Sequence, residues 1–261
     1  MGGLVWIEPG VAADLAFAGV APAVVRAALE AALPDTDVIA QIAAGRRRML
    51  LVADMDSTMI TVECIDELAD YAGIKAEVAA VTEAAMRGEL DFADALHARV
   101  ALLAGLPART IERCRAERVR LMPGARALVR TMRARGARTV LVSGGFTAFA
   151  DPVGAEIGFE RVVANELLIS GGALTGKVAT PIVDSATKLD VLRAEAGGGG
   201  LLASLAVGDG ANDIPMIEAA GLGVAYHAKP KTAVAAGAAV RFGDLTVLLY
   251  AQGYPRRDWV S

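Results

Sequence analysis

Two aspartates one residue apart follow an apolar segment in Asp54-Met55-Asp56-Ser57-Thr58. If residues 49–53 form a buried strand, its period of two sends Asp54 and Asp56 toward the same side at the carboxyl end of the strand. Two carboxylates crowded there repel each other, and a hard cation such as Mg2+ relieves the repulsion and also holds a phosphate oxygen. The pair predicts metal-assisted phosphoryl chemistry. An ordinary turn followed by a helix cap uses the same residue types.

Two further positions suit the binding of a phosphate. The apolar residues 140–142 lead into Ser143-Gly144-Gly145, where small residues let backbone N–H groups approach an anion closely. We predict that Ser143 and Gly144 cradle the phosphate, although such a sequence taken alone fits a simple turn. Lys188 precedes an apolar helical segment and offers a compact positive charge to the transferring phosphate, whereas most lysines are only solvated.

A second acidic motif spans residues 207–213, Val-Gly-Asp-Gly-Ala-Asn-Asp, after another apolar segment and before a helix expected from about Ile214. We expect Asp209 to ligate the metal, Asp213 to complete the acidic site directly or through water, and Asn212 to fix neighbouring groups by hydrogen bonding. A loop with helix caps is the alternative. A dinucleotide-binding fingerprint is rejected, because Asp213 stands where its third glycine is required.

The elements that must position these residues alternate between helix and strand from residue 123 onward. This pattern predicts an α/β fold with a Rossmann-like, doubly wound parallel sheet, whose ligands bind outside the carboxyl ends of the strands. The expected strands are 49–53, 138–142, 161–164, 205–207, 223–226 and 239–242, with an added hairpin of 167–170 and 173–178. Pro152 is expected to interrupt the helix that follows Gly145 by kinking it.

A block of helices interrupts this pattern after the first core strand. Apolar residues at spacings of three and four predict helices over 62–71, 75–87, 92–103 and 108–119. We expect residues 63–121 to form a small helical cap that excludes water from the strand ends. The catalytic core then comprises 46–62 and 122–261, and residues 1–45 form a separate N-terminal segment with a helix at 24–33.

Composition limits the classes of protein that fit. The 261 residues, of which 54% are hydrophobic, suffice for a full core and a smaller insert. A net charge of -4 argues against nucleic acid as a partner. Cys64 and Cys114 are too few for a disulfide framework or a zinc cluster and fit a cytoplasmic protein. No apolar segment reaches the roughly 18–20 residues that span a bilayer, so we expect neither a signal peptide nor a membrane anchor.

The ordered set of motifs resembles the haloacid-dehalogenase superfamily of phosphatases, over nearly all of residues 50–249. The resemblance implies the fold predicted above and Mg2+ as cofactor. It also implies that Asp54 is the nucleophile that forms an aspartyl-phosphate and that Asp56 is the general acid and base. The implied metal ligands are Asp54, the backbone carbonyl of Asp56, Asp209 and Asp213.

Within that superfamily, the cap resembles the branch that hydrolyses O-phospho-L-serine to L-serine and phosphate, the last step of serine biosynthesis. The matching segments are 63–67, 85–92, 99–100 and 225–230. The resemblance implies that Glu63 binds the ammonium of the substrate, that Arg99 binds its carboxylate, and that Met86 and Phe92 are apolar lid residues. The implied phosphate-binding residues are Ser143, Gly144, Lys188 and Asn212. Without the resemblance, Glu63 and Arg99 fit a surface pair and the two apolar residues fit a core.

Two other activities remain open from the sequence: transfer of the phosphoryl group to another alcohol such as homoserine, or action on another small phosphomonoester. A phosphate-accepting signalling module is the alternative without catalysis, but it needs neither Asp56 nor the cap. Relatives often carry an N-terminal amino-acid-binding regulatory domain, and residues 1–45 are too few for more than a reduced one.

We expect a monomer or homodimer with a small-molecule substrate. We assign Cys64, His97, His227 and residues 46–48 to packing or solvated surface.

Overall fold

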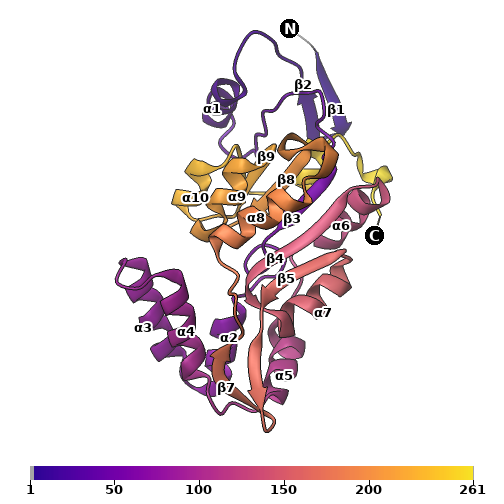
Figure 1. Cartoon of the computed structure of the whole chain (residues 1–261). Coiled ribbons are helices and arrows are strands. Elements are labelled where there is room, and N and C mark those ends of the chain that lie inside the picture. Colours follow the sequence, from indigo (N-terminus) through magenta and orange to yellow (C-terminus); the bar gives the residue numbers. More distant parts are fainter. Residues whose placement is uncertain (1–2, 261) are drawn as a thin grey trace.

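The core of the structure is a six-stranded parallel sheet with the strand order β10-β9-β8-β3-β4-β5. The computed structural model describes residues 3–260 (Figure 1). The strands of this sheet are β3 (Leu50–Ala53), β4 (Arg138–Phe146), β5 (Arg161–Asn165), β8 (Ser204–Gly208), β9 (Leu222–Tyr226) and β10 (Ala238–Val240). Helices cover both faces of the sheet, which confirms the predicted doubly wound architecture.

The central strand β3 is buried on both faces, as expected for a parallel sheet. Leu51 and Ala53 belong to the core that contains residues of helices α6 (Ala125–Ala134) and α7 (Thr147–Ile157). Leu50 and Val52 belong to the core that contains residues of α8 (Ser185–Glu195) and α9 (Ile214–Ala219). Since both faces of β3 are apolar, this segment of the chain offers charged side chains only after Ala53, the last residue of the strand.

Two local predictions differ from the structure. Strand β4 continues to Phe146 rather than ending at Val142, and its pairing with β5 shifts register between these two residues. Helix α7 runs through Pro152 without a break, so the predicted interruption is wrong, while the predicted kink stays a prediction. The ring removes one backbone hydrogen bond, but Phe149 and Val153, on either side of the proline, are buried in the core and hold the helix.

The helical insertion follows β3 and lies beyond the carboxyl ends of the core strands (Figure 1). Its helices are α2 (Cys64–Ala72), α3 (Lys75–Met86), α4 (Phe92–Leu102) and α5 (Arg109–Arg118).

A hairpin of β6 (Leu167–Ser170) and β7 (Ala173–Val178) projects from the core into the cap. Backbone N–H groups of Gly105 and Ala108 donate to the carbonyls of Leu174 and Gly172, at 2.8 and 2.9 Å, and Leu174 donates to Leu106 at 2.9 Å. The hairpin was predicted; that it extends the cap was not.

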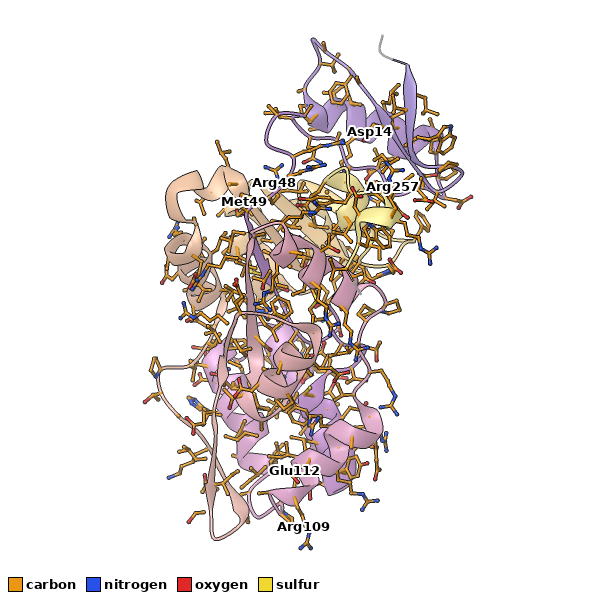
Figure 2. The ribbon with its side chains drawn as sticks, turned by 90° about the vertical axis from the view of Figure 1, so that its right-hand side faces the viewer. Asp14, Arg48, Met49, Arg109, Glu112 and Arg257 are labelled. Carbon is orange, nitrogen blue, oxygen red and sulfur yellow. The ribbon has the colours of Figure 1, made fainter. Side chains whose placement is uncertain are left out.

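The N-terminal segment lies at the opposite end of the molecule from the cap: Figure 2 shows Asp14 far from Arg109 and Glu112. It contains the hairpin of β1 (Leu4–Glu8) and β2 (Ala12–Leu15) and helix α1 (Pro22–Ala32). The Asp37 carboxylate anchors it by accepting hydrogen bonds from the backbone of Arg241 and Gly243, at 2.6 and 2.8 Å. A regulatory role for residues 1–45 stays a prediction.

The remaining helices are α10 (Pro230–Ala235) and α11 (Val247–Ala251). Within residues 3–260, none of the helices has the length and the apolar character that a bilayer crossing requires.

Glu195, at the end of α8, holds that helix against the starts of two strands. Its side chain is only 8% exposed and forms ion pairs with Arg138 of β4 and Arg161 of β5. Burial raises the pKa of Glu195, but the hydrogen bonds and charges of the two arginines outweigh it and lower the pKa below its ordinary value. Ionised Glu195 therefore stabilises the fold at neutral pH.

We expect Glu195→Gln to lower the free energy of unfolding by about 1 kcal/mol at pH 7. Because the pKa is depressed in the folded state, this contribution is present above the unfolded-state pKa of Glu and disappears as the pH falls through the folded-state pKa. Urea unfolding across that range measures it. Asp190→Asn is the control in the same helix, because its ion pair with Arg193 is solvent-exposed and spans 3.9 Å. An unchanged difference from neutral to acid pH would contradict the role of the charge.

Candidate active site

The acidic and hydroxyl motifs meet because their strands are neighbours in the sheet. Strand β3 pairs with β8 on one side and β4 on the other. The backbone N–H of Asp54, directly after β3, donates to the carbonyl of Val207 in β8 at 3.0 Å. Asp209 follows β8, and Ser143 lies in the last part of β4. Residues more than 150 positions apart in the sequence are thereby brought to one edge of the sheet.

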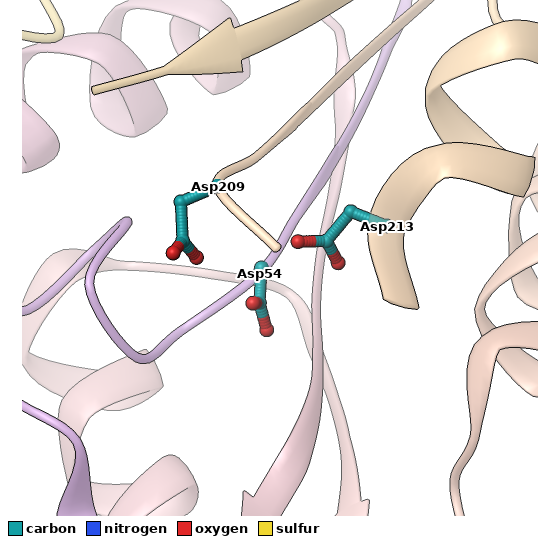
Figure 3. A group of neighbouring side chains, drawn as sticks. All are labelled: Asp54, Asp209 and Asp213. Atoms are coloured by element: carbon teal, nitrogen blue, oxygen red, sulfur yellow. The ribbon is translucent and has the colours of Figure 1, made fainter. Parts of the chain in front are cut away.

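Three carboxylates converge at this edge. One oxygen each from Asp54, Asp209 and Asp213 lies within 4.8 Å of the others (Figure 3). Burial and the charge of Asp213 raise the pKa of Asp54 well above its usual range, and the same two causes raise the pKa of Asp209 to about 6. Such a crowded set of hard oxygen donors fits a cation of the Mg2+ type.

Lys188 supplies a cation to this cluster from within the protein. Its side chain is fully buried, and Nζ lies 2.7 Å from Asp54 Oδ1 and 2.6 Å from Asp213 Oδ1. Burial by itself lowers the pKa of Lys188, but Asp213 and Asp54 outweigh it and raise the pKa. The raised pKa values of Asp54 and Asp209 show that the carboxylates resist ionising together. Full ionisation beside the one ammonium would leave two negative charges, which one divalent cation would neutralise.

Two glycines allow Asp213 to enter the cluster. A Cβ atom at Gly208 would collide with the Asp213 carboxyl group, and the backbone N–H of Gly210 donates to Asp213 Oδ2 at 3.0 Å. A Cβ atom at Gly210 would collide with the Asn212 side chain. Asn212 therefore lies beside this loop, while Asp213 is turned inward.

Asp56 lies beside the acidic cluster, against the end of β4. A Cβ atom at Gly145 would lie 3.0 Å from both Asp56 Oδ2 and Ser143 Oγ, so a larger residue there would press on both side chains. Burial, followed by the charge of Glu63, raises the pKa of Asp56 to about 7, whereas hydrogen bonding from Cys64 opposes the shift. Asp56 Oδ1 is buried without a hydrogen-bond partner among the described residues. The protonation state of Asp56 can therefore change near neutral pH.

Residues of the cap complete the site. Glu63 precedes α2, and its Oε1 accepts a hydrogen bond of 2.7 Å from Ser57 Oγ. Ser57 has φ +54°, a left-handed conformation that is strained for a residue with a side chain. The Phe92 ring covers the end of β4, since a Cβ atom at Gly144 would lie 3.2 Å from Phe92 Cζ. The side chain of Met86 lies outside those that the structure describes.

Arg99 faces the site from α4. Burial lowers the pKa of Arg99, while the charges of Asp66, Glu63 and Asp56 oppose this shift. Its Nε donates to the Ala95 carbonyl at 3.2 Å. Within residues 3–260 its guanidinium forms no ion pair within 4.0 Å.

The structure thus brings together most of the residues selected from the sequence, and it adds others. Ser57 donates a hydrogen bond to Glu63. Cys64 is buried, as its assignment to packing predicts, and it also hydrogen-bonds to Asp56. Asn165 holds the end of β4 and was not selected. The residues next to Asn165 in the sequence do not indicate its role, because its hydrogen-bond partners are backbone groups of distant segments.

A parallel α/β core with an acidic site beneath a helical cap is the architecture of a haloacid dehalogenase-like hydrolase, and the family comparison agrees. A family model described as haloacid dehalogenase-like hydrolase matches residues 51–218, more than half of the chain. The chain belongs to this family.

Two relatives that align with most of this chain are both named phosphoserine phosphatase. A phosphoserine phosphatase of Streptomyces coelicolor is 49% identical over 257 residues, 96% of this chain and 62% of that protein. A phosphoserine phosphatase of Mycobacterium tuberculosis is 48% identical over 217 residues, 82% of this chain and 53% of that protein. The chain therefore spans little more than half of the length of these two relatives.

A solved structure agrees with these relatives in fold. It is described as a phospho-aspartyl intermediate analogue of phosphoserine phosphatase and is 35% identical. It superposes with a TM-score of 0.72, covering 78% of this chain and 98% of the other.

Mg2+ is expected to stabilise the folded protein through the three carboxylates. At a concentration 100 times the dissociation constant, binding to the folded state adds about 2.7 kcal/mol to the free energy of unfolding. Asp209→Asn should remove most of this gain, which chemical unfolding with Mg2+ and with a chelator measures. Glu112→Gln, at the exposed tip of the cap, is the control. Equal gains in both variants would place the cation elsewhere.

Proposed function

We propose that this protein hydrolyses O-phospho-L-serine to L-serine and phosphate, with Asp54 as the nucleophile. The observation that carries the proposal is the pairing of a phosphoryl site with two oppositely charged cap residues. The charge of Glu63 raises the pKa of Asp56, and the charges of Glu63 and Asp56 act on Arg99, which supports a position of both cap residues near Asp56. A carboxylate suits the ammonium of an amino acid, and a guanidinium suits its carboxylate. The names of the similar relatives support the same substrate.

In the first half of the proposed reaction, Asp54 attacks phosphorus in line and the bond from phosphorus to the serine oxygen breaks. Asp56 donates its proton to the departing oxygen, and an aspartyl-phosphate remains on Asp54. In the second half, Asp56 takes a proton from the water that attacks this intermediate, and phosphate leaves. A pKa of about 7 suits a group that must both donate and accept a proton.

The phosphoryl oxygens need positive charge and hydrogen-bond donors. We assign these roles to Lys188, Ser143, the backbone of Gly144 and Asn212. Mg2+, held by Asp54, Asp209, the backbone carbonyl of Asp56 and Asp213 directly or through water, would supply further neutralisation of the phosphoryl charge. The carboxylate cluster supports this assignment, because all its donors are hard oxygens within 4.8 Å.

The cap is assigned a role in excluding water and selecting the substrate. Phe92 covers Gly144, and we assign Phe92 and Met86 to the apolar part of the substrate pocket. Closure over the strand ends strengthens the electrostatic interactions inside the site. We further propose that the reaction is the last step of serine biosynthesis in the cytoplasm, a compartment that the two free cysteines support.

The proposal is tested by phosphate release from O-phospho-L-serine, its D form and p-nitrophenyl phosphate, each with Mg2+ and with a chelator. We expect Mg2+-dependent hydrolysis that favours the L form. Asp54→Asn should reduce turnover to background while the variant remains folded, because an amide oxygen is a poor nucleophile. Substantial residual turnover, or formation of a phosphorylated acceptor instead of phosphate, would contradict the proposed reaction.

Arg99→Ala should weaken the use of phosphoserine far more than the use of phosphoethanolamine, which lacks the carboxylate. A lost charge-assisted contact of roughly 1.5–3 kcal/mol lowers kcat/KM by about 10- to 100-fold. Arg109→Ala, an exposed arginine of the same cap, is the control and should change neither substrate. Equal losses on both substrates would remove Arg99 from recognition of the carboxylate.

A further inference from the structure

A buried asparagine connects the end of β4 to the base of the β6–β7 hairpin, which contacts the cap. Asn165 is the last residue of β5 and is 2% exposed. Its Nδ2 donates to the carbonyl of Gly144 at 2.9 Å, and its Oδ1 accepts from the backbone N–H of Val183 at 2.7 Å. Nδ2 also lies 3.4 Å from the carbonyl of Val183. One short side chain thus holds two segments that are 39 positions apart in the sequence, at residues 144 and 183.

The carboxamide nitrogen of Asn165 holds the part of β4 that departs from regular pairing with β5. Val142 pairs with Val163 and Phe146 pairs with Asn165, so four steps along β4 match two steps along β5. The extra residues form a bulge that contains Ser143, Gly144 and Gly145. A bulge re-aims side chains and leaves backbone groups without partners in the ladder, and Asn165 supplies the partner for the Gly144 carbonyl.

This contact also determines the orientation of Ser143. The Gly144 carbonyl and the Gly145 N–H belong to the same planar peptide unit. The Gly145 N–H donates to Ser143 Oγ at 2.9 Å, so this hydroxyl oxygen already accepts a hydrogen bond. Its own proton is then available to donate to another oxygen, such as that of a phosphate. Fixing the carbonyl of Gly144 therefore fixes the donor that faces the reaction.

The carboxamide oxygen of Asn165 closes the base of the β6–β7 hairpin. The hairpin leaves the core directly after Asn165, and its return strand leads to Val183. The backbone N–H of Ala179 donates to the carbonyl of Glu166 at 2.9 Å, which closes the same base. Helix α8 starts two residues after Val183 and carries Lys188. Asn165 is thus placed where the phosphate cradle, the support of the cap and the helix of Lys188 meet.

We propose that Asn165 is a positioning residue for phosphoryl transfer: its carboxamide orients the Gly144–Gly145 peptide and the Ser143 hydroxyl, and ties them to the base of the hairpin. The inference rests on the proposed function, because it places a phosphoryl group at Ser143 and Gly144. A carboxamide is required because it is a donor and an acceptor at once, whereas an ionised carboxylate only accepts. Asn165→Asp keeps the bond from the Val183 N–H but sets a second acceptor against the Gly144 carbonyl.

The test compares Asn165→Asp with a matched change in another buried carboxamide. Gln252 is fully buried, accepts from the backbone N–H of Arg48 at 2.9 Å and donates to the carbonyl of Leu248 at 3.0 Å. It lies outside the site, so Gln252→Glu reports the structural cost alone. Asn165→Ser keeps a polar group that is too short for both partners, and it carries the test if Asn165→Asp does not fold.

We expect both acidic variants to lower Tm, but only the Asn165 variants to lower kcat, on the order of 100-fold, with KM within a few fold. Their affinity for orthovanadate, a tetrahedral ion that becomes a five-coordinate analogue of the transferring group when a nucleophile adds to it, should fall in parallel when it is measured by calorimetry with Mg2+. If folded Asn165 variants retain kcat and vanadate affinity within two-fold, or lose no more than Gln252→Glu, the proposal is overturned.

All measurements use both O-phospho-L-serine and p-nitrophenyl phosphate. If the unmodified protein hydrolyses only the second compound, the proposed substrate is wrong, and a loss of p-nitrophenyl phosphate turnover in Asn165→Asp still supports the positioning role. If it hydrolyses both and Asn165→Asp matches Gln252→Glu on both, the proposed function stands and the positioning role fails. Vanadate affinity decides the role of Asn165 even without turnover.

Discussion

The buried ammonium of Lys188 is the interaction on which the site depends. Removed from solvent, it contacts Asp54 and Asp213 at less than 3 Å. A buried ion without partners costs several kcal/mol, and here each ion is a partner for the others. The one ammonium does not match the number of acidic groups, because Asp209 adds a third carboxylate to Asp54 and Asp213. The surplus carboxylate at the edge of an otherwise apolar sheet is the physical basis for the proposed binding of a cation and a phosphoryl group there.

The strand order makes this concentration of charge possible. Strand β3 lies between β8 and β4, so the residues that follow all three strands share one edge. The faces of β3 are apolar on both sides, which confines the charges to its carboxyl end. The helical insertion follows the same strand, so Glu63 lies only nine positions after Asp54. A short connection therefore couples the acidic cluster to the cap that covers it.

The cap is attached to the core at more than its own two ends. Backbone hydrogen bonds join it to the β6–β7 hairpin, and the base of that hairpin is closed by Asn165. Phe92 of the cap covers Gly144, whose carbonyl Asn165 holds. Gly144 thus lies between Phe92 of the cap and Asn165 at the base of the hairpin. Packed side chains and hydrogen bonds, as well as the chain connections, therefore join the cap to the end of β4.

The sequence by itself determined the class of fold, the helical insertion and the acidic positions, because apolar periodicity and the residues that end each strand are encoded by near neighbours. From Asp54 and Asp209 alone, a site at the carboxyl edge of the sheet was predictable. Only the tertiary structure decided which carboxylates Lys188 contacts, that Asn165 holds Gly144, and that α7 continues through Pro152. Those outcomes depend on packing between segments far apart in the chain, which no local pattern of residue types records.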